Sequence, residues 1–123
     1  LPDNVRCWFS YTVTAFNVHH TTDFINWVDE QQFSKLNRVK HHMAYNPPYL
    51  NVQVLPEEYK KYVTDKLDVD SPICKSISKY MNSKSTTELY WNDFVSITTR
   101  LEKIRNQDIK KTLPELGKYV KQI

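Results

Sequence analysis

The chain has 123 residues and a mass of 14.7 kDa, and its 17 basic and 14 acidic side chains leave a formal net charge of +3. This length is typical of one domain, so we expect residues 1–123 to form a single domain. The one glycine, Gly117, excludes the glycine-rich phosphate-binding loops, which need several glycines.

The first 55 residues carry the pattern of a βαβ unit. Apolar side chains alternate with polar ones from Val5 to Ala15, which predicts a strand. The apolar residues of Thr22–Lys35 have helical spacing, and Arg38–Ala44 predicts a second strand. Strands joined through a helix are parallel, so we expect these two to be parallel neighbours. A further short alternation predicts a strand over Leu50–Leu55.

The rest of the chain, residues 56–123, has a helical pattern. Pro56 and Pro72 mark the starts of two helices. Residues 85–88 fit a capping box, Ser85 with Glu88, which would open the longest helix. Its expected apolar stripe is Tyr90, Phe94, Ile97, Leu101 and Ile104. A last short helix is expected from Leu113. The predicted fold is α/β, a βαβ unit followed by three or more C-terminal helices.

Composition also bears on compartment and membrane. No apolar run approaches the roughly 18 residues of a membrane span, so we predict none. Cys7 and Cys74 cannot complete a four-ligand zinc or iron–sulfur site by themselves. We favour two free, structural thiols in a reducing, cytoplasmic compartment, and a disulfide between them is the alternative.

Four histidines form two adjacent pairs, His19 with His20 and His41 with His42. One histidine of each pair could approach a common point if the two strands are neighbours. Zinc needs a third protein ligand, and no residue offers one at ligand spacing. We therefore predict no metal site, and we identify no catalytic residue.

Lysines recur along the predicted helices beside tyrosines, at Lys60, Lys61, Lys66, Lys75, Lys79 and Lys84. Basic and aromatic side chains together can bind single-stranded nucleic acid. Acidic residues are mixed in throughout, so we interpret these lysines as solvated helix exteriors and regard nucleic acid as an unlikely partner.

A polar ridge runs along the first strand to its carboxyl end, through Ser10, Thr12, Thr14 and Asn17. Ligands of α/β folds bind at the carboxyl ends of parallel strands. The ridge would bind a ligand only if further strands completed the pocket. The alternative is a solvated face whose threonines reflect β propensity.

Six short blocks, in their order and spacing, resemble the C-terminal part of the twitch-domain radical SAM proteins of bacteriophages and marine bacteria. The blocks are residues 12–17 (TVTAFN), 45–50 (YNPPYL), 53–60 (QVLPEEYK), 80–84 (YMNSK), 101–107 (LEKIRNQ) and 113–116 (LPEL).

The resemblance implies that residues 1–55 end a partial (β/α) barrel and that 56–123 form its helical C-terminal part. In the full-length family a C-x3-C-x2-C loop holds a [4Fe–4S] cluster that binds and cleaves S-adenosylmethionine. This chain has no such loop, so no cofactor is expected in it and it is expected to be inactive alone. In an intact barrel, Thr12, Thr14 and Asn17 would lie near S-adenosylmethionine.

We therefore interpret the chain as a fragment of a radical SAM-like protein whose N-terminal barrel half is its missing partner. The alternative is a small, self-contained viral or environmental interaction module, and a weak nucleic-acid binder is less favoured. A homodimer is expected, through the first strand with Trp8 or through Leu50–Leu55. In the rival arrangement the C-terminal helices cover the sheet of a monomer.

Overall fold

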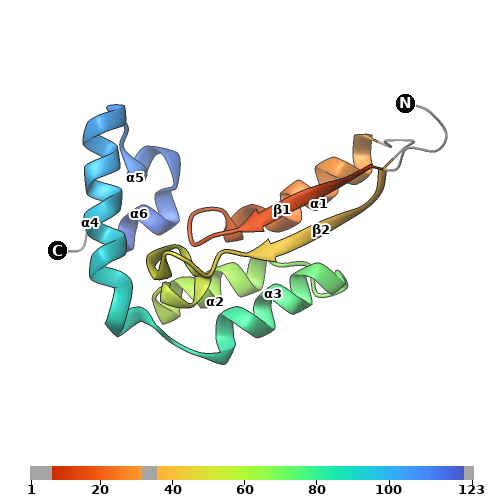
Figure 1. Cartoon of the computed structure of the whole chain (residues 1–123), viewed down its shortest axis with the longest axis horizontal. Coiled ribbons are helices and arrows are strands. Elements are labelled where there is room, and N and C mark those ends of the chain that lie inside the picture. The colour runs from red at the N-terminus through yellow and green to blue at the C-terminus, as the bar shows by residue number, and fades with distance from the viewer. Residues whose placement is uncertain (1–6, 32–35, 121–123) are drawn as a thin grey trace.

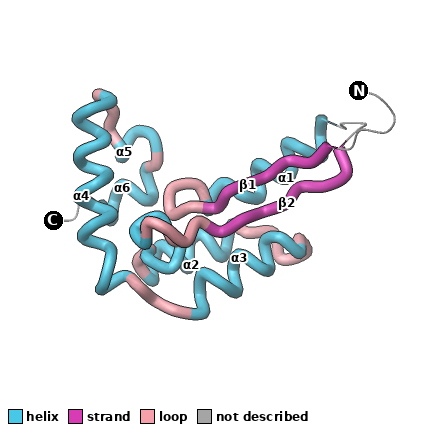
Figure 2. Tube along the Cα trace, viewed as in Figure 1, coloured by secondary structure: helices cyan, strands magenta, loops and turns pink. Residues whose placement is uncertain are grey.

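The computed structural model describes residues 7–31 and 36–120, with the side chains of 7–8 and 36–38 outside the described set. The described residues form two strands, six α-helices and three 3-10 turns, so the fold is mixed α/β and mostly helical (Figures 1 and 2). The elements are β1 (Cys7–Val13), η1 (Val18–His20), α1 (Thr21–Gln31), β2 (Leu36–Met43), η2 (Pro48–Leu50), η3 (Val52–Val54), α2 (Glu57–Lys66), α3 (Pro72–Ser83), α4 (Thr87–Arg105), α5 (Ile109–Thr112) and α6 (Pro114–Val120).

The predicted βαβ unit is confirmed. Strands β1 and β2 are parallel neighbours, with Phe9 beside Val39 and Tyr11 beside His41. β1 ends at Val13, two residues before its predicted end, because the chain turns at residues 14–17, which form the β1 turn, instead of continuing straight. Residues 5–6 of the first predicted strand and residues 32–35 of the predicted helix lie outside the described residues.

The two faces of the β1–β2 sheet differ in character. On one face the Tyr11 ring stacks on Phe24 of α1, with centroids 4.5 Å apart, and Phe9 meets the same ring edge-on at 5.9 Å. These contacts hold α1 along β1 (Figure 1). On the opposite face Ser10, Thr12 and His42 are exposed. In the described part of the sheet, α1 therefore covers one face, and the other face is largely exposed, with Lys40 on it half-buried.

The predicted strand at Leu50–Leu55 is wrong, because the segment forms the 3-10 turns η2 and η3. The Asn51 side chain accepts a hydrogen bond from the Gln53 N–H (3.0 Å) and so closes the second turn. Gln53, at the expected polar position, is buried, and its amide donates to the Tyr80 carbonyl oxygen (2.9 Å). Residues 52–55 are all buried, so the apolar spacing does not mark one buried face.

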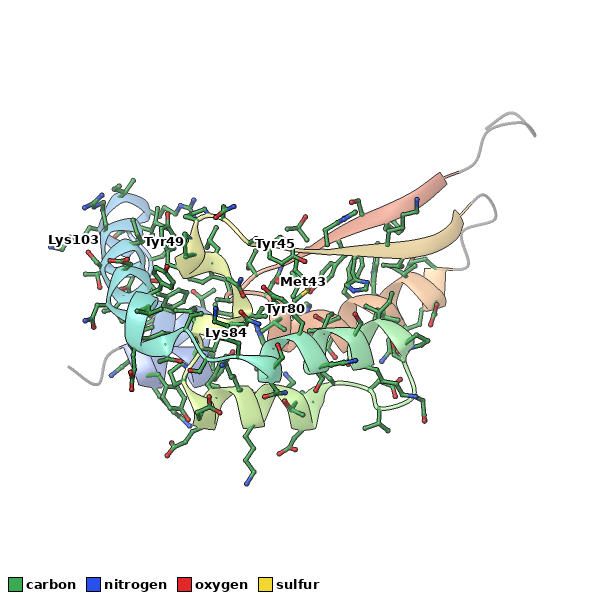
Figure 3. The ribbon with its side chains drawn as sticks, turned by 60° about the horizontal axis from the view of Figure 1, so that its bottom comes forward. Met43, Tyr45, Tyr49, Tyr80, Lys84 and Lys103 are labelled. Atoms are coloured by element: carbon green, nitrogen blue, oxygen red, sulfur yellow. The ribbon has the colours of Figure 1, made fainter. Side chains whose placement is uncertain are left out.

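The segment between β2 and α2 also joins β2 to the helices. In this segment the Tyr45 ring meets the Tyr80 ring of α3 edge-on, with centroids 5.7 Å apart (Figure 3). Tyr80 in turn accepts a hydrogen bond from the Asn51 amide (2.7 Å). This contact positions α3 beneath the end of β2.

Helices α2 and α3 begin where the prolines predict. Ser71 caps α3 by accepting a hydrogen bond from the Cys74 N–H (3.3 Å). The predicted capping box of α4 is wrong: the Ser85 hydroxyl bonds to the Thr87 hydroxyl (3.1 Å), and the cap residue Thr86 makes no side-chain bond. The Thr87 hydroxyl also donates to the Leu55 carbonyl oxygen (3.0 Å), so tertiary contacts with η3 fix this helix start.

Only part of the predicted apolar stripe of α4 is buried. Phe94 is fully buried, but Ile104 is 72% exposed, because ten residues at about 100° each turn it about 80° away from Phe94 around the helix axis. The last short helix, predicted from Leu113, is confirmed as α6, and a further short helix that was not predicted, α5, precedes it and packs on it. The core joins α2, α3 and α4 to the β1 turn, with Val13, Val63, Ile77, Met81, Phe94 and Leu116 at its centre.

Two strands do not make a barrel, so the partial barrel stays a prediction. No helix in the described ranges is both long and apolar enough to cross a membrane.

Candidate functional site

The structure brings the predicted site residues together at the carboxyl end of β1. Both ends of the Asn17 side-chain amide bind the main chain of this strand. Its Oδ1 accepts from the Thr14 N–H (2.8 Å), and its Nδ2 donates to the Thr12 carbonyl oxygen (2.9 Å). Both the oxygen and the nitrogen of the amide are therefore already hydrogen-bonded within the protein.

These two bonds lie on the outer edge of β1. In a strand, neighbouring residues direct their N–H and C=O groups to opposite edges, and the Val13 carbonyl accepts from the Ala44 N–H (2.9 Å) on the β2 side. Thr12 and Thr14 therefore face away from β2. The Asn17 amide takes the place that a third strand would take there, and it blocks that end of the edge.

Further hydrogen bonds hold the rest of the β1 turn. The Tyr11 hydroxyl donates to the Asn17 carbonyl oxygen (3.1 Å), and burial raises the pKa of Tyr11. The Phe16 N–H donates to the Thr14 hydroxyl (3.2 Å). Thr12 alone among the three predicted residues presents an exposed side chain. Contact of this turn with a cofactor stays a prediction.

Replacing Asn17 with alanine is expected to lower the free energy of unfolding by about 1–2 kcal/mol, because one donor and one acceptor of β1 lose their partner. Urea denaturation followed by circular dichroism measures this. Asn26→Ala is the matched control, since Asn26 is exposed on α1 and alanine favours helix. Equal midpoints for the two variants would show that the Asn17 amide does not hold the turn.

The two histidine pairs lie in different elements, one after the first strand and one in the second, as the sequence suggested. His19 and His20 lie in η1, and His41 and His42 lie in β2. The His20 imidazole Nδ1 lies 3.3 Å from an Asp23 carboxylate oxygen, and both side chains are exposed. Among residues 7–31 and 36–120, no three His, Cys, Asp or Glu side chains form a group that could hold a metal.

Two of these histidines favour the neutral form. Burial, followed by the positive charge of Lys66, lowers the pKa of His19. Burial, followed by His42, lowers the pKa of His41. In the unfolded chain both should titrate near pH ~6.5.

We expect the protein to lose stability as the pH falls below about 6.5, because the unfolded chain then binds protons that the folded chain does not. The sign follows from the lowered folded pKa values, so the loss continues until the pH passes below them. Urea midpoints at pH about 7.5 and about 5 measure the effect. His19→Asn should make the dependence shallower, and Asn26→Ala, which changes no titratable group, should not. A flat profile in the unsubstituted chain would contradict this.

The structure confirms the predicted free thiol of Cys74 and corrects the predicted exposure of Lys60. Cys74 is a free, buried thiol, with its Sγ 3.6 Å from the Thr22 hydroxyl, and the Cys7 side chain lies outside the described set. Lys60 is not on a helix exterior, because it is only 1% exposed. Its Nζ donates to the Lys84 carbonyl oxygen (3.3 Å) just after α3, and burial lowers its pKa. The lysine thus satisfies a carbonyl group at the end of α3.

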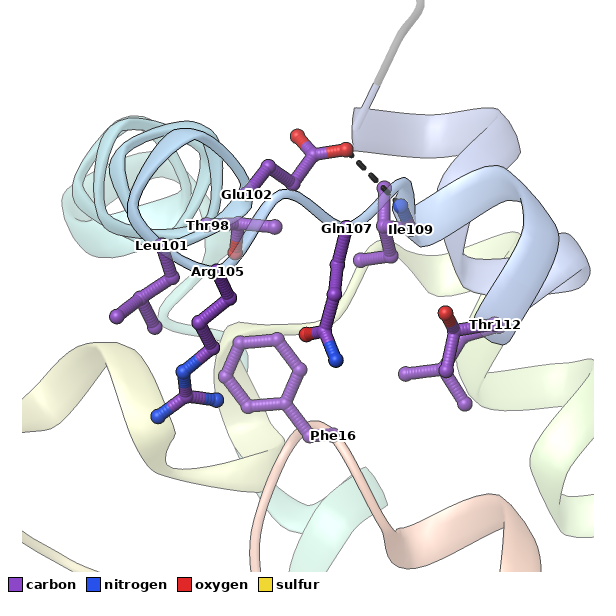
Figure 4. Close-up of a pocket in the computed structure, with 9 residues that line it drawn as sticks. Phe16, Thr98, Leu101, Glu102, Arg105, Gln107, Ile109 and Thr112 are labelled. Carbon is purple, nitrogen blue, oxygen red and sulfur yellow. Dashed lines mark hydrogen bonds between the residues drawn. The ribbon is translucent and has the colours of Figure 1, made fainter.

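A cavity missed by the sequence analysis lies next to the β1 turn (Figure 4). It has a volume of about 260 Å³ and lies between Phe16 of the turn, the second half of α4, and α5. Leu101, Ile109 and Leu113 supply apolar walls. Thr98 was not singled out in the sequence, although its position one helical turn beyond Phe94 placed it on the buried side of α4.

Comparison with protein-family models, with curated proteins and with solved structures gives no match for this chain. The resemblance to radical SAM proteins therefore stays a prediction from the sequence.

Proposed function

We propose that this chain is a non-catalytic module that adds β1 and β2 to a larger parallel sheet. In a partial barrel of the radical SAM type, the missing strands come before β1 in the chain and would lie beside β1, so a joining edge at β2 points to another chain. The observation that carries the proposal is the outer edge of β2, against which no strand lies in the described part of the chain.

The character of the sheet supports this role. Parallel sheets occur almost only where both faces are covered, and a two-stranded sheet is marginally stable by itself. Here the face with Ser10, Thr12 and His42 is exposed. Further strands or another chain would complete both the edge and the face.

The structure also favours β2 over β1 as the joining edge. The Ala44 N–H bonds to β1, so Val39, His41 and Met43 direct their main-chain groups outward by alternation. On β1, the Asn17 amide already blocks the carboxyl end of the outer edge. The Leu50–Leu55 segment offers no strand, and its residues Val52–Leu55 are buried within the monomer.

When the chain is isolated, we expect a second copy to take the place of the missing strands, which gives a symmetric dimer through β2. Light scattering at micromolar concentration should then report twice the 14.7 kDa of one chain. The amide of His41 should exchange slowly with deuterium. A mass of 14.7 kDa together with a fast-exchanging His41 amide would contradict the proposal.

Two proline variants show which strand edge forms the dimer. His41→Pro removes an outward N–H of β2 and Ser10→Pro removes one of β1, and edge strands tolerate proline at such positions. We expect His41→Pro to abolish the dimer and Ser10→Pro to retain it. Circular dichroism checks that both variants remain folded.

The interaction-module alternative uses the same edge without a barrel. The sequence encoded immediately before Leu1 separates the two: an in-frame C-x3-C-x2-C loop supports the barrel, and its absence supports the self-contained module.

A further inference from the structure

Thr98 lines the cavity beside the β1 turn, and its buried hydroxyl has no hydrogen-bond partner among the described residues. Thr98 is 3% exposed, and its Oγ1 forms no hydrogen bond. A threonine inside a helix commonly bonds to the carbonyl group four residues earlier, but Thr98 does not. Figure 4 shows Thr98 on the side of α4 that faces Phe16 and Gln107. A buried polar group left unpaired is unfavourable, so this position suits a polar atom of a bound molecule.

A free positive charge lies at the mouth of the same cavity. Arg105 lines the cavity, and its exposed guanidinium forms no ion pair or hydrogen bond with any residue that the structure describes. Glu102, the acidic residue of the lining, is directed elsewhere, since its Oε2 accepts from the Ile109 N–H (2.9 Å; Figure 4).

The surrounding segment is also basic. Residues 100–112 hold five basic side chains and two acidic ones, so their net charge of +3 equals that of the whole chain. Of the two acids, Glu102 binds the Ile109 N–H and Asp108 caps α5 through the Lys110 N–H (3.0 Å). The charge at this end of the molecule therefore complements an anion.

The floor of the cavity is aromatic. Phe16 packs on Phe94 with ring centroids 4.8 Å apart, and Phe94 stacks on Trp91 at 4.9 Å. Phe16 is the last ring of this series and also lines the cavity. A flat ring bound in the cavity would extend the series, and aromatic rings favour such offset stacking.

Independently of the proposed sheet-completing role, we infer that this cavity binds a small phenolic carboxylate. Its ring lies against Phe16, its phenolic hydroxyl bonds to the Thr98 hydroxyl, and its carboxylate pairs with Arg105. The helix rise places residues 98 and 105 about 10 Å apart along α4. With the reach of the arginine side chain, a para-substituted ring with a polar group at each end fits this separation.

Three probes test each contact separately. The complete probe is 4-hydroxyphenylacetate, phenylacetate lacks the phenolic hydroxyl, and 4-hydroxyphenylacetamide lacks the negative charge. Titration of the whole chain, followed through its backbone amide signals by NMR, should give saturable shifts around Thr98, Leu101 and Ile109. We expect phenylacetate to bind about fivefold more weakly and the amide about tenfold more weakly than the complete probe.

Variants then assign the two polar contacts. Thr98→Val should remove the preference for the phenolic hydroxyl, and the matched Thr99→Val should keep it. Arg105→Met should remove the preference for the carboxylate, and Arg100→Met, which takes the same charge from outside the cavity, should keep it. The inference is overturned if no probe gives saturable shifts at these residues, if the three probes bind equally, or if the control variants change the preferences as much as the cavity variants.

Discussion

Replacing Phe94 with alanine is expected to lower the free energy of unfolding by about 3–5 kcal/mol. Phe94 is fully buried, and its ring lies between Trp91 of α4 and Phe16 of the β1 turn. Its removal leaves a cavity where α4 meets that turn, and both neighbouring rings lose a stacking partner. Urea denaturation followed by circular dichroism, at one fixed protein concentration, measures the loss.

Leu89→Ala provides the control on the same helix. Leu89 is 68% exposed, so its truncation should change the free energy of unfolding by no more than about 0.5 kcal/mol. If Phe94→Ala had an effect as small as this, α4 could not be packed against the β1 turn as described.

Replacing Gly117 with alanine is expected to lower the free energy of unfolding by about 2 kcal/mol. A Cβ atom at this position would lie 2.9 Å from the Lys110 Cα and 3.0 Å from its backbone nitrogen. Alanine favours helix over glycine by about 1 kcal/mol, but a backbone atom cannot rotate away, so the overlap outweighs this gain. α5 and α6 must separate, which moves the buried Ile109 and Leu116. Thermal unfolding reports the change as a lower midpoint.

Lys118→Ala controls for a change on the same helix. It removes only the exposed ion pair with Glu115 (3.1 Å), which should contribute less than about 1 kcal/mol. A more stable Gly117→Ala variant would show that α5 and α6 are packed less closely than the structure has them.

Long periodic segments of this fold could be predicted from the sequence, and short buried ones could not. The change from alternating to helical spacing predicted β1, α1 and β2, because each of these elements has one buried side. Between residues 50 and 55 that reasoning failed, since a short segment buried on every side has the same apolar content as a strand. The capping box at Ser85 failed because tertiary bonds of Thr87 compete with local capping.

The candidate sites show the same limit. Thr12, Thr14 and Asn17 are close in sequence, and their meeting at one strand end was predictable. The sequence does not show that the Asn17 amide binds main-chain groups, because that depends on the backbone path of the turn. The cavity joins Phe16 to Thr98 and Arg105, which no local pattern connects.

The unequal edges of the sheet limit how many copies can join. An open-ended fibril needs two free edges on every subunit, so that each added copy offers a new one. On β1 the Asn17 amide occupies the edge at Thr12 and Thr14, which leaves only a short stretch toward Trp8 for any incoming strand. In the proposed dimer, pairing through β2 would therefore end with two chains, because the Asn17 amide leaves no complete second edge for amyloid-like growth.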